Sequence, residues 1–176
     1  MHPLILTPKP APRFRATLMR VLVREQPATE LTIATRILAR AGALAANGRV
    51  SFRLGDVLYI GGRGISLATM TPYDVAVVLV RDGEALHGSP PDDVAAYLDA
   101  HRRLADAASV ARIADGEYVS APTLRGCVVA ALRRMRGQET TRDEIAVEEA
   151  WLELVSQARI SGALFGAFPT EDEPSP

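Results

Sequence analysis

The sequence predicts a single α/β domain in which helices flank a central, mainly antiparallel β-sheet. Three observations predict this class. The stretch from 47 to 91 holds short apolar segments of strand length, separated by glycine turns. The segments before and after it carry apolar residues at helical spacing. The chain has 176 residues, of which 48% are hydrophobic, which is enough for one core and too little for two ordinary domains.

The chain ahead of the sheet is expected to form two helices. Apolar side chains recur at helical spacing over residues 13–25 and again over residues 29–41. Pro27 is expected to separate the two helices, because proline interrupts a helix interior. The polar cluster that begins at Thr29 offers a cap for the second helix, and Gly42 stands near its end.

The sheet itself is predicted from four segments. Residues 50–54 alternate apolar with polar side chains and are followed by the tight turn Gly55-Asp56, which predicts an antiparallel hairpin with residues 57–60. The continuous apolar run over 75–80 is suited to a strand that is buried on both faces. Residues 85–87 follow a glycine turn and are expected to pair with that run.

Beyond the sheet the pattern becomes mainly helical again. A helix is predicted over 94–104, followed by a modest strand over 107–113. A turn then leads into a helix over 122–135, which we expect Gly137 to end. The last element is a long closing helix over 141–163.

The domain organisation follows from the ends of the chain. Residues 1–12 contain four prolines and are expected to form an extended arm. Residues 169–176 are acidic and proline-rich, so we expect a disordered tail. The predicted domain is residues 13–168.

Composition excludes several classes of function. Twenty basic and twenty-one acidic side chains give a net charge of −1, so there is no electrostatic case for a nucleic-acid or membrane partner. The single Cys127 cannot form an internal disulfide, which suits a reducing compartment. The amino terminus does not match a secretory signal, and no segment is long enough to cross a bilayer. We therefore expect a cytoplasmic protein.

Two strings in the central stretch carry a family resemblance. NGRVSFRLGD, and after a short strand RGISLATMTPYDVAVVLVRDGEALHGSPPDD, resemble the class II aldolase and adducin head-domain family. The resemblance runs in order over residues 29–114, and residues 149–164 are similar to the closing helix of the family. It implies a class II aldolase-like fold that is truncated, because part of the family's later strands has no counterpart between Ile113 and the closing helix.

The resemblance also implies a metal site that this sequence does not retain. Family members hold a divalent metal, usually zinc, with three histidines, two of them in a His-x-His at a strand end, while an acidic residue on the preceding helix handles protons. If Asp93 takes that acidic position, the His-x-His falls on Arg112-Ile113-Ala114, and no histidine follows His101. We expect His101 and His87 to be packing or surface residues. We therefore expect neither a metal nor another cofactor.

An anion site is the second feature that the resemblance implies. In the family the first hairpin, the glycine loop and the residues before the acidic position hold the substrate phosphate. The corresponding positions here are Arg49, Arg63, Gly64 and Asp92. Two interpretations remain open. The two arginines bind a phosphate or carboxylate through their forked donors, or they form solvated ion pairs with neighbouring aspartates.

Three functions follow from these observations. The preferred hypothesis is a non-catalytic class II aldolase-like protein that acts as an oligomerising, interaction or small-molecule-binding module. The alternative is a metal-independent lyase or isomerase that acts on a small phosphorylated or carboxylated carbonyl compound, with Asp93 as acid/base and Arg112 as a fixed positive charge. The third is a sensor or carrier that uses the loop 61–64. Family members build their sites between subunits, so the resemblance implies a homo-oligomer.

Overall fold

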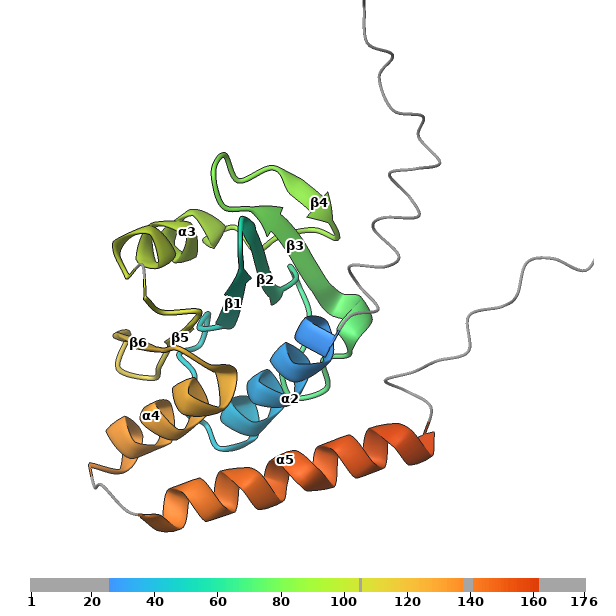
Figure 1. The fold of residues 1–176 in the computed structure, drawn as a ribbon, viewed down its shortest axis with the longest axis vertical. Coiled ribbons are helices and arrows are strands. Elements are labelled where there is room, and N and C mark those ends of the chain that lie inside the picture. Colours follow the sequence, from blue (N-terminus) through green and yellow to red (C-terminus); the bar gives the residue numbers. More distant parts are fainter. Residues whose placement is uncertain (1–25, 105, 138–140, 162–176) are drawn as a thin grey trace, which may run out of the picture.

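The protein forms a six-stranded antiparallel sheet with helices on both faces (Figure 1). The structure, a computed structural model, describes residues 26–104, 106–137 and 141–161. The strand order is β4-β3-β2-β1-β5-β6, so the predicted single α/β domain with an antiparallel sheet is confirmed. The predicted arm, the helix over 13–25 and the tail over 169–176 lie outside the described residues.

The predicted hairpin is present at the centre of the sheet. Strand β1 (Val50–Leu54) pairs with β2 (Val57–Gly61), and the register joins Leu54 to Val57 across the turn. Gly55 has a φ of 60°, in the left-handed region that favours glycine. The short turn fixes the register, and the register in turn decides which side chains of β1 face each side of the sheet.

The next two strands extend the sheet as predicted. Strand β3 (Val75–Leu79) pairs with β2, and β4 (Ala85–His87) pairs with β3. The 3-10 turn η1 (Pro72–Asp74) leads into β3. Four consecutive residues of β3 are buried, so this strand has protein on both of its faces.

The other half of the sheet was only partly predicted. Strand β5 (Ser109–Arg112) pairs with β1, within the strand expected over 107–113. Strand β6 (Tyr118–Ala121) then pairs with β5, where the sequence predicted a turn leading directly into a helix. The turn and the helix are present, and the strand between them was missed, because four residues at a sheet edge, one exposed and three half-buried, are too few to show a period of two.

Four helices cover the sheet (Figure 1). Helices α2 (Gln26–Arg40) and α4 (Leu124–Arg136) pack on one face, and α5 (Thr141–Ser161) lies outside them against both. Helix α3 (Val94–Arg103) packs on the opposite face. Among the described helices, none combines the length and the apolar character that crossing a membrane requires.

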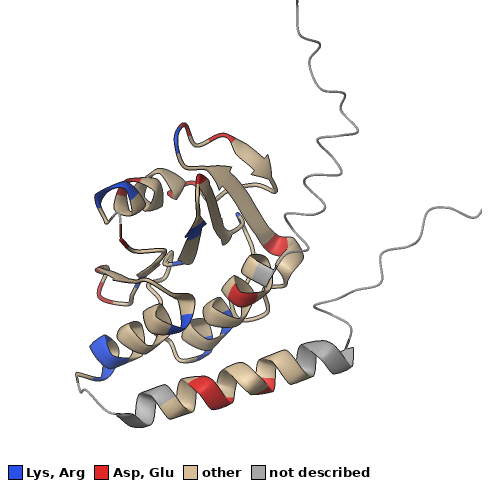
Figure 2. Cartoon of the chain, viewed as in Figure 1, with Lys and Arg blue, Asp and Glu red and all other residues tan. Residues whose placement is uncertain are grey.

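The ends of the helices show which boundary predictions hold. Helix α2 is described from Gln26, so Pro27 lies in its first turn, ahead of the start expected at Thr29. Proline is tolerated there because the first N–H groups of a helix have no partner within it. Gly137, with a φ of 68°, ends α4 as predicted. Figure 2 shows basic residues at the C-terminal ends of α3 and α4, where the helix dipole favours them.

Two apolar clusters lie on opposite faces of the sheet. The larger cluster joins α2, α4 and α5 to the sheet and includes Leu31, Val50 and Trp151. The smaller cluster lies beneath α3 and includes Leu58 and Tyr97. The face beneath α3 therefore has less apolar material, and polar side chains occupy the remainder of it.

Candidate functional site

The polar side chains beneath α3 come from alternating positions of the neighbouring strands. Val50 belongs to the larger cluster on the α2 face, so Arg49 and Ser51 point to the α3 face. Ser51 pairs with Val110, and Arg112 donates its backbone N–H to the carbonyl of Arg49 at 3.1 Å. Cross-strand partners share a face. The α3 seam, as we name it, comprises Arg49, Ser51, Asp93, Tyr97, His101, Arg112 and Tyr118.

Helix α3 contributes every fourth residue to this seam. Asp93 at the start of the helix, Tyr97 and His101 stand at successive intervals of four, which places them on one helical face. Tyr97 and His101 lie in the helix predicted over 94–104. Both side chains are fully buried, so this face of α3 packs on the sheet. Asp93 lies on the same face and is therefore directed towards the sheet as well.

Tyr97 joins the helix to the strand that carries Arg49. Its hydroxyl accepts a hydrogen bond from the backbone N–H of Arg49 at 2.8 Å. Its ring meets the ring of Tyr118 edge-to-face, with centroids 5.6 Å apart. Burial, reinforced by the negative charge of Asp93, raises the pKa of Tyr97. Tyr97 is therefore a neutral donor and acceptor rather than a base.

His101 forms a second polar contact deeper in the seam. Its Nε2 lies 2.9 Å from the hydroxyl oxygen of Ser51, and both residues are fully buried. Burial lowers the pKa of His101 to about 4, and the nearby charge of Arg53 acts in the same direction. His101 is therefore neutral near pH 7, and this geometry agrees with its expected role as a packing residue.

Arg112 lies at the open side of the seam. Its guanidinium carbon is 6.0 Å from the ring centroid of Tyr118, at the outer limit of a cation–π contact. Tyr118 in turn contacts Tyr97, whose pKa responds to the charges of both Asp93 and Arg49. The fold thus brings three predicted site residues, Arg49, Asp93 and Arg112, onto the same face around two tyrosines.

Three atoms of the seam are buried without a hydrogen-bond partner among the described residues: Nε of Arg49, Oδ2 of Asp93 and Nδ1 of His101. Of these, Arg49 Nε is a donor and Asp93 Oδ2 is an acceptor. Buried polar groups in folded proteins nearly always have a partner, either protein, water or ligand. The opposite polarity of these two atoms suits a small molecule that offers an acceptor to one and a donor to the other.

The glycine loop shows a different arrangement. Arg63 Nη2 lies 2.6 Å from Asp92 Oδ1, and the two side chains are 62% and 82% exposed. The solvated ion pair, one of the two interpretations of these residues, is therefore present at Arg63, and such pairs contribute about 0–1 kcal/mol. Gly64 has a φ of 71° and open space around its Cα.

The amides of this loop are largely committed to the protein. Gly62 donates to the carbonyl of Asp74 at 2.8 Å, and Arg63 donates to that of Ser89 at 2.9 Å. A Cβ on Gly62 would meet the Asp74 oxygen at 2.8 Å, which explains why glycine stands there. The loop therefore holds the chain together, and these two N–H groups are not available to an anion.

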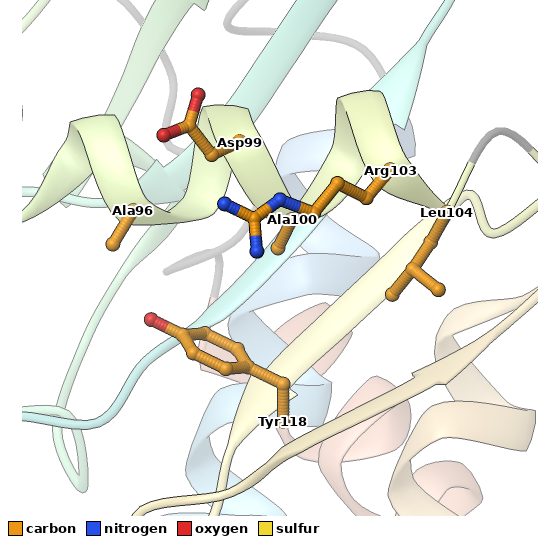
Figure 3. Close-up of a pocket in the computed structure, with 6 residues that line it drawn as sticks. All are labelled: Ala96, Asp99, Ala100, Arg103, Leu104 and Tyr118. Carbon is orange, nitrogen blue, oxygen red and sulfur yellow. The ribbon is translucent and has the colours of Figure 1, made fainter.

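A pocket opens beside the seam, between α3 and β6 (Figure 3). It has a volume of about 390 Å³. Its lining residues are Ala96, Asp99, Ala100, Arg103, Leu104 and Tyr118. A second pocket, of about 410 Å³, shares Arg103 and Leu104 and continues along the strand to Pro122. This groove was not predicted, because one of its walls is strand β6, for which the sequence shows no clear pattern.

The seam residues do not fit a divalent metal. Within the described residues, no group of three His, Cys, Asp or Glu side chains is placed to hold one. Arg112, where the resemblance would put the first ligand, is a permanent cation that repels a metal. Cys127 belongs to the larger cluster on the other face, and burial raises the pKa of its thiol to about 12.

Comparison with known proteins gives a family and a set of similar solved structures, including two of YgbL. The family model described as "Class II Aldolase and Adducin N-terminal domain" matches residues 29–148. The crystal structure of YgbL from Klebsiella pneumoniae, a putative aldolase/epimerase/decarboxylase, is 18% identical with a TM-score of 0.46, over 51% of this chain and 44% of that one. YgbL from Escherichia coli, described in the same words, is 24% identical with a TM-score of 0.38, over 56% and 44%. The chain spans less than half the length of either. No curated protein matches it.

Proposed function

Because this chain belongs to the class II aldolase and adducin N-terminal domain family, we propose that it is a non-catalytic member that oligomerises and binds a small molecule. The observation that carries the proposal is the α3 seam, where Arg49 Nε and Asp93 Oδ2 are buried without partners in the described part of the chain. Arg112 contributes a further positive charge at its open side. This arrangement favours binding of a polar ligand over holding a metal.

The chemistry of these atoms indicates the ligand class. A guanidinium donates to phosphate or carboxylate oxygens, and a carboxylate accepts from a hydroxyl group. The proposed ligand is therefore a small phosphorylated or carboxylated compound that also carries a hydroxyl. Such hydrogen bonds are stronger in a buried seam than in water, because the local dielectric is lower.

Thermal-shift measurements with sugar phosphates and short hydroxy acids test this proposal. A ligand at one hundred times its Kd stabilises the folded chain by about 2.7 kcal/mol, which raises Tm by several degrees. We expect Arg49→Met to remove the shift and Arg63→Met to retain it, because Arg63 lies in the exposed glycine loop. A shift that survives in Arg49→Met, or one that disappears only in Arg63→Met, would contradict binding in the seam.

A catalytic alternative rests on Asp93. Its buried, unpartnered Oδ2 stands at the start of α3 in the seam that also contains Arg112. A carboxylate so placed can take up a proton from a carbonyl compound, and a fixed guanidinium can stabilise the developing enolate. The chain would then be a lyase or isomerase.

Turnover assays on any ligand found by thermal shift separate the two functions. The non-catalytic proposal expects no turnover in the native chain. If turnover is found, Asp93→Asn and Arg112→Met should abolish it while leaving a measurable thermal shift. Full activity in both variants would remove the catalytic alternative as stated, and stoichiometric zinc together with aldol cleavage would overturn the non-catalytic proposal.

A further inference from the structure

Strand β6 forms one edge of the sheet and presents backbone groups outward. The β5–β6 ladder places Ile113 opposite Glu117, and Ile113 donates its N–H to the carbonyl of Glu117 at 2.9 Å. Hydrogen-bonded and non-hydrogen-bonded pairs alternate in an antiparallel ladder. Val119, two residues further along, therefore also directs its backbone N–H and C=O groups towards β5. Tyr118 and Ser120 direct their N–H and C=O groups away from the sheet.

This edge lacks the features that usually prevent pairing with another chain. Proteins protect edge strands with charged residues, prolines, bulges or very short length. The opposite edge, β4, has three residues and a register shift opposite Val77 and Val78. Strand β6 has four residues and a regular register, and none of these residues is charged (Figure 2). Of the two edges, β6 is the one open to pairing.

We propose that β6 pairs antiparallel with β6 of a second copy of this chain, about a twofold axis at Val119. This rests on the oligomerising role proposed above and names its surface. The outward-pointing backbone groups determine the register. When Val119 lies opposite the partner's Val119, Tyr118 lies opposite the partner's Ser120, and both residues direct their N–H and C=O groups towards the other copy. Moving the axis to Ser120 would set Tyr118 opposite the partner's Pro122, which has no N–H. Moving it to Tyr118 would set Ser120 opposite a residue in the turn at Gly116.

The side chains along β6 complement one another in this register. Tyr118, which is 37% exposed, falls opposite the partner's Ser120, beside the pocket that ends at Pro122. Arg103 and Tyr118 line the first pocket together (Figure 3), and Asp106 and Ser120 line the second. Neither of these charges forms an ion pair within the described residues. The twofold axis brings Arg103 of each copy towards the partner's Asp106, so opposite charges meet.

Sedimentation of the full chain and of two Ser120 variants tests the surface. Ser120→Pro removes an outward N–H and no β5–β6 hydrogen bond, so the fold should persist while the dimer dissociates at least tenfold more readily. Ser120→Ala keeps the N–H and should remain dimeric. Circular dichroism confirms folding of each variant. A native monomer would overturn both this inference and the oligomerising role, whereas a dimer unaffected by Ser120→Pro would overturn the surface alone.

A cysteine cross-link tests the register and does not depend on the proline variant. Directly opposed residues of a non-hydrogen-bonded pair lie close enough for a disulfide, so Val119→Cys should give a covalent dimer under mild oxidation. Ser120→Cys is the matched control and should not cross-link, because the axis sets Ser120 opposite Tyr118. Both variants also carry Cys127→Ala, because the Sγ of native Cys127 lies 3.7 Å from the Val119 carbonyl oxygen and would compete for a thiol at position 119. A covalent dimer from Ser120→Cys, or none from Val119→Cys, would contradict the proposal.

Discussion

The pair formed by Ser51 and His101 shows how a polar contact is accommodated inside the domain. Both side chains are fully buried beneath α3, and His101 Nε2 lies 2.9 Å from the Ser51 hydroxyl oxygen, while His101 Nδ1 has no hydrogen-bond partner among the described residues. Burying such groups without a partner would cost about 1–3 kcal/mol. The pair therefore links α3 to β1 only while His101 stays neutral, because its pKa of about 4 reflects the cost of burying a charge.

Stability should therefore fall as the pH decreases from about 6.5 to 4. In this window the unfolded chain binds a proton at His101 and the folded chain does not, so protons favour unfolding. The full effect is about 3 kcal/mol at pH 4. Urea unfolding at several pH values measures it. His101→Gln should remove this part of the pH dependence, and His87→Gln should retain it. Identical slopes in the native chain and in His101→Gln would contradict the assignment.

Individual residues of the candidate site were predictable where they followed a motif. Arg49, Asp93 and Arg112 were predicted from the resemblance, and the fold does bring them to one face. Tyr97 and Tyr118 were not predicted as site residues. The hydroxyl of Tyr97 meets Arg49, which lies far away in the sequence, so no local pattern reveals the contact. The sequence also left open whether Arg63 forms an ion pair or a free anion site, and the structure shows the ion pair.

Among the elements, α5 is held by a few contacts. Val147, Trp151 and Leu154 are buried, at spacings that place them on one helical face. The guanidinium of Arg125 in α4 lies 5.0 Å from the Trp151 ring centroid and pairs with Glu148 at 2.6 Å. This group joins α5 to α4 and to the larger cluster.

Removing Trp151 should destabilise the domain strongly. Trp151→Ala truncates a residue that is only 3% exposed, and such truncations cost about 3–5 kcal/mol. The neighbouring Leu152 is 56% exposed, so Leu152→Ala is the matched control and should change stability by less than about 1 kcal/mol. Denaturant unfolding followed by circular dichroism checks both. Equal losses in the two variants would show that α5 does not dock through this face.

The predictability of each element followed its length and its position. Helices α3 and α4 and the β1–β2 hairpin were predictable because their periodicity and turn residues agree. Strand β6 was not predictable because its four residues lie at an edge and carry a mixed pattern. The start of α2 was misplaced because Pro27 was interpreted as a break, whereas the first turn of a helix accepts it.

At the scale of the whole molecule, one sheet separates an apolar face from a partly polar one. The larger cluster beneath α2, α4 and α5 provides most of the apolar burial, while the face beneath α3 is shared by the smaller cluster and the seam. The side chains beneath α3 can therefore be substituted without loss of the fold, because the larger cluster maintains it.

This division predicts that the fold does not depend on a divalent metal. Incubation with a chelator should leave Tm unchanged, and added zinc should raise it by less than a degree, because the seam presents Arg112 where the resemblance would put the first ligand and the described residues hold no group of three ligands. Differential scanning calorimetry with and without chelator measures this. A Tm that drops by several degrees after chelation would indicate a metal site that the seam residues do not account for.

The position of β1 between β2 and β5 has a consequence for how the chain folds. The β1–β2 hairpin joins neighbours across a short turn, whereas the pairing of Phe52 with Ser109 must close a much longer loop. Loop closure of this kind slows folding, because its entropy is lost before the distant contacts compensate. We therefore expect the meander from β1 to β4 to form first in folding, and the half that contains β5 and β6 to pack onto it afterwards.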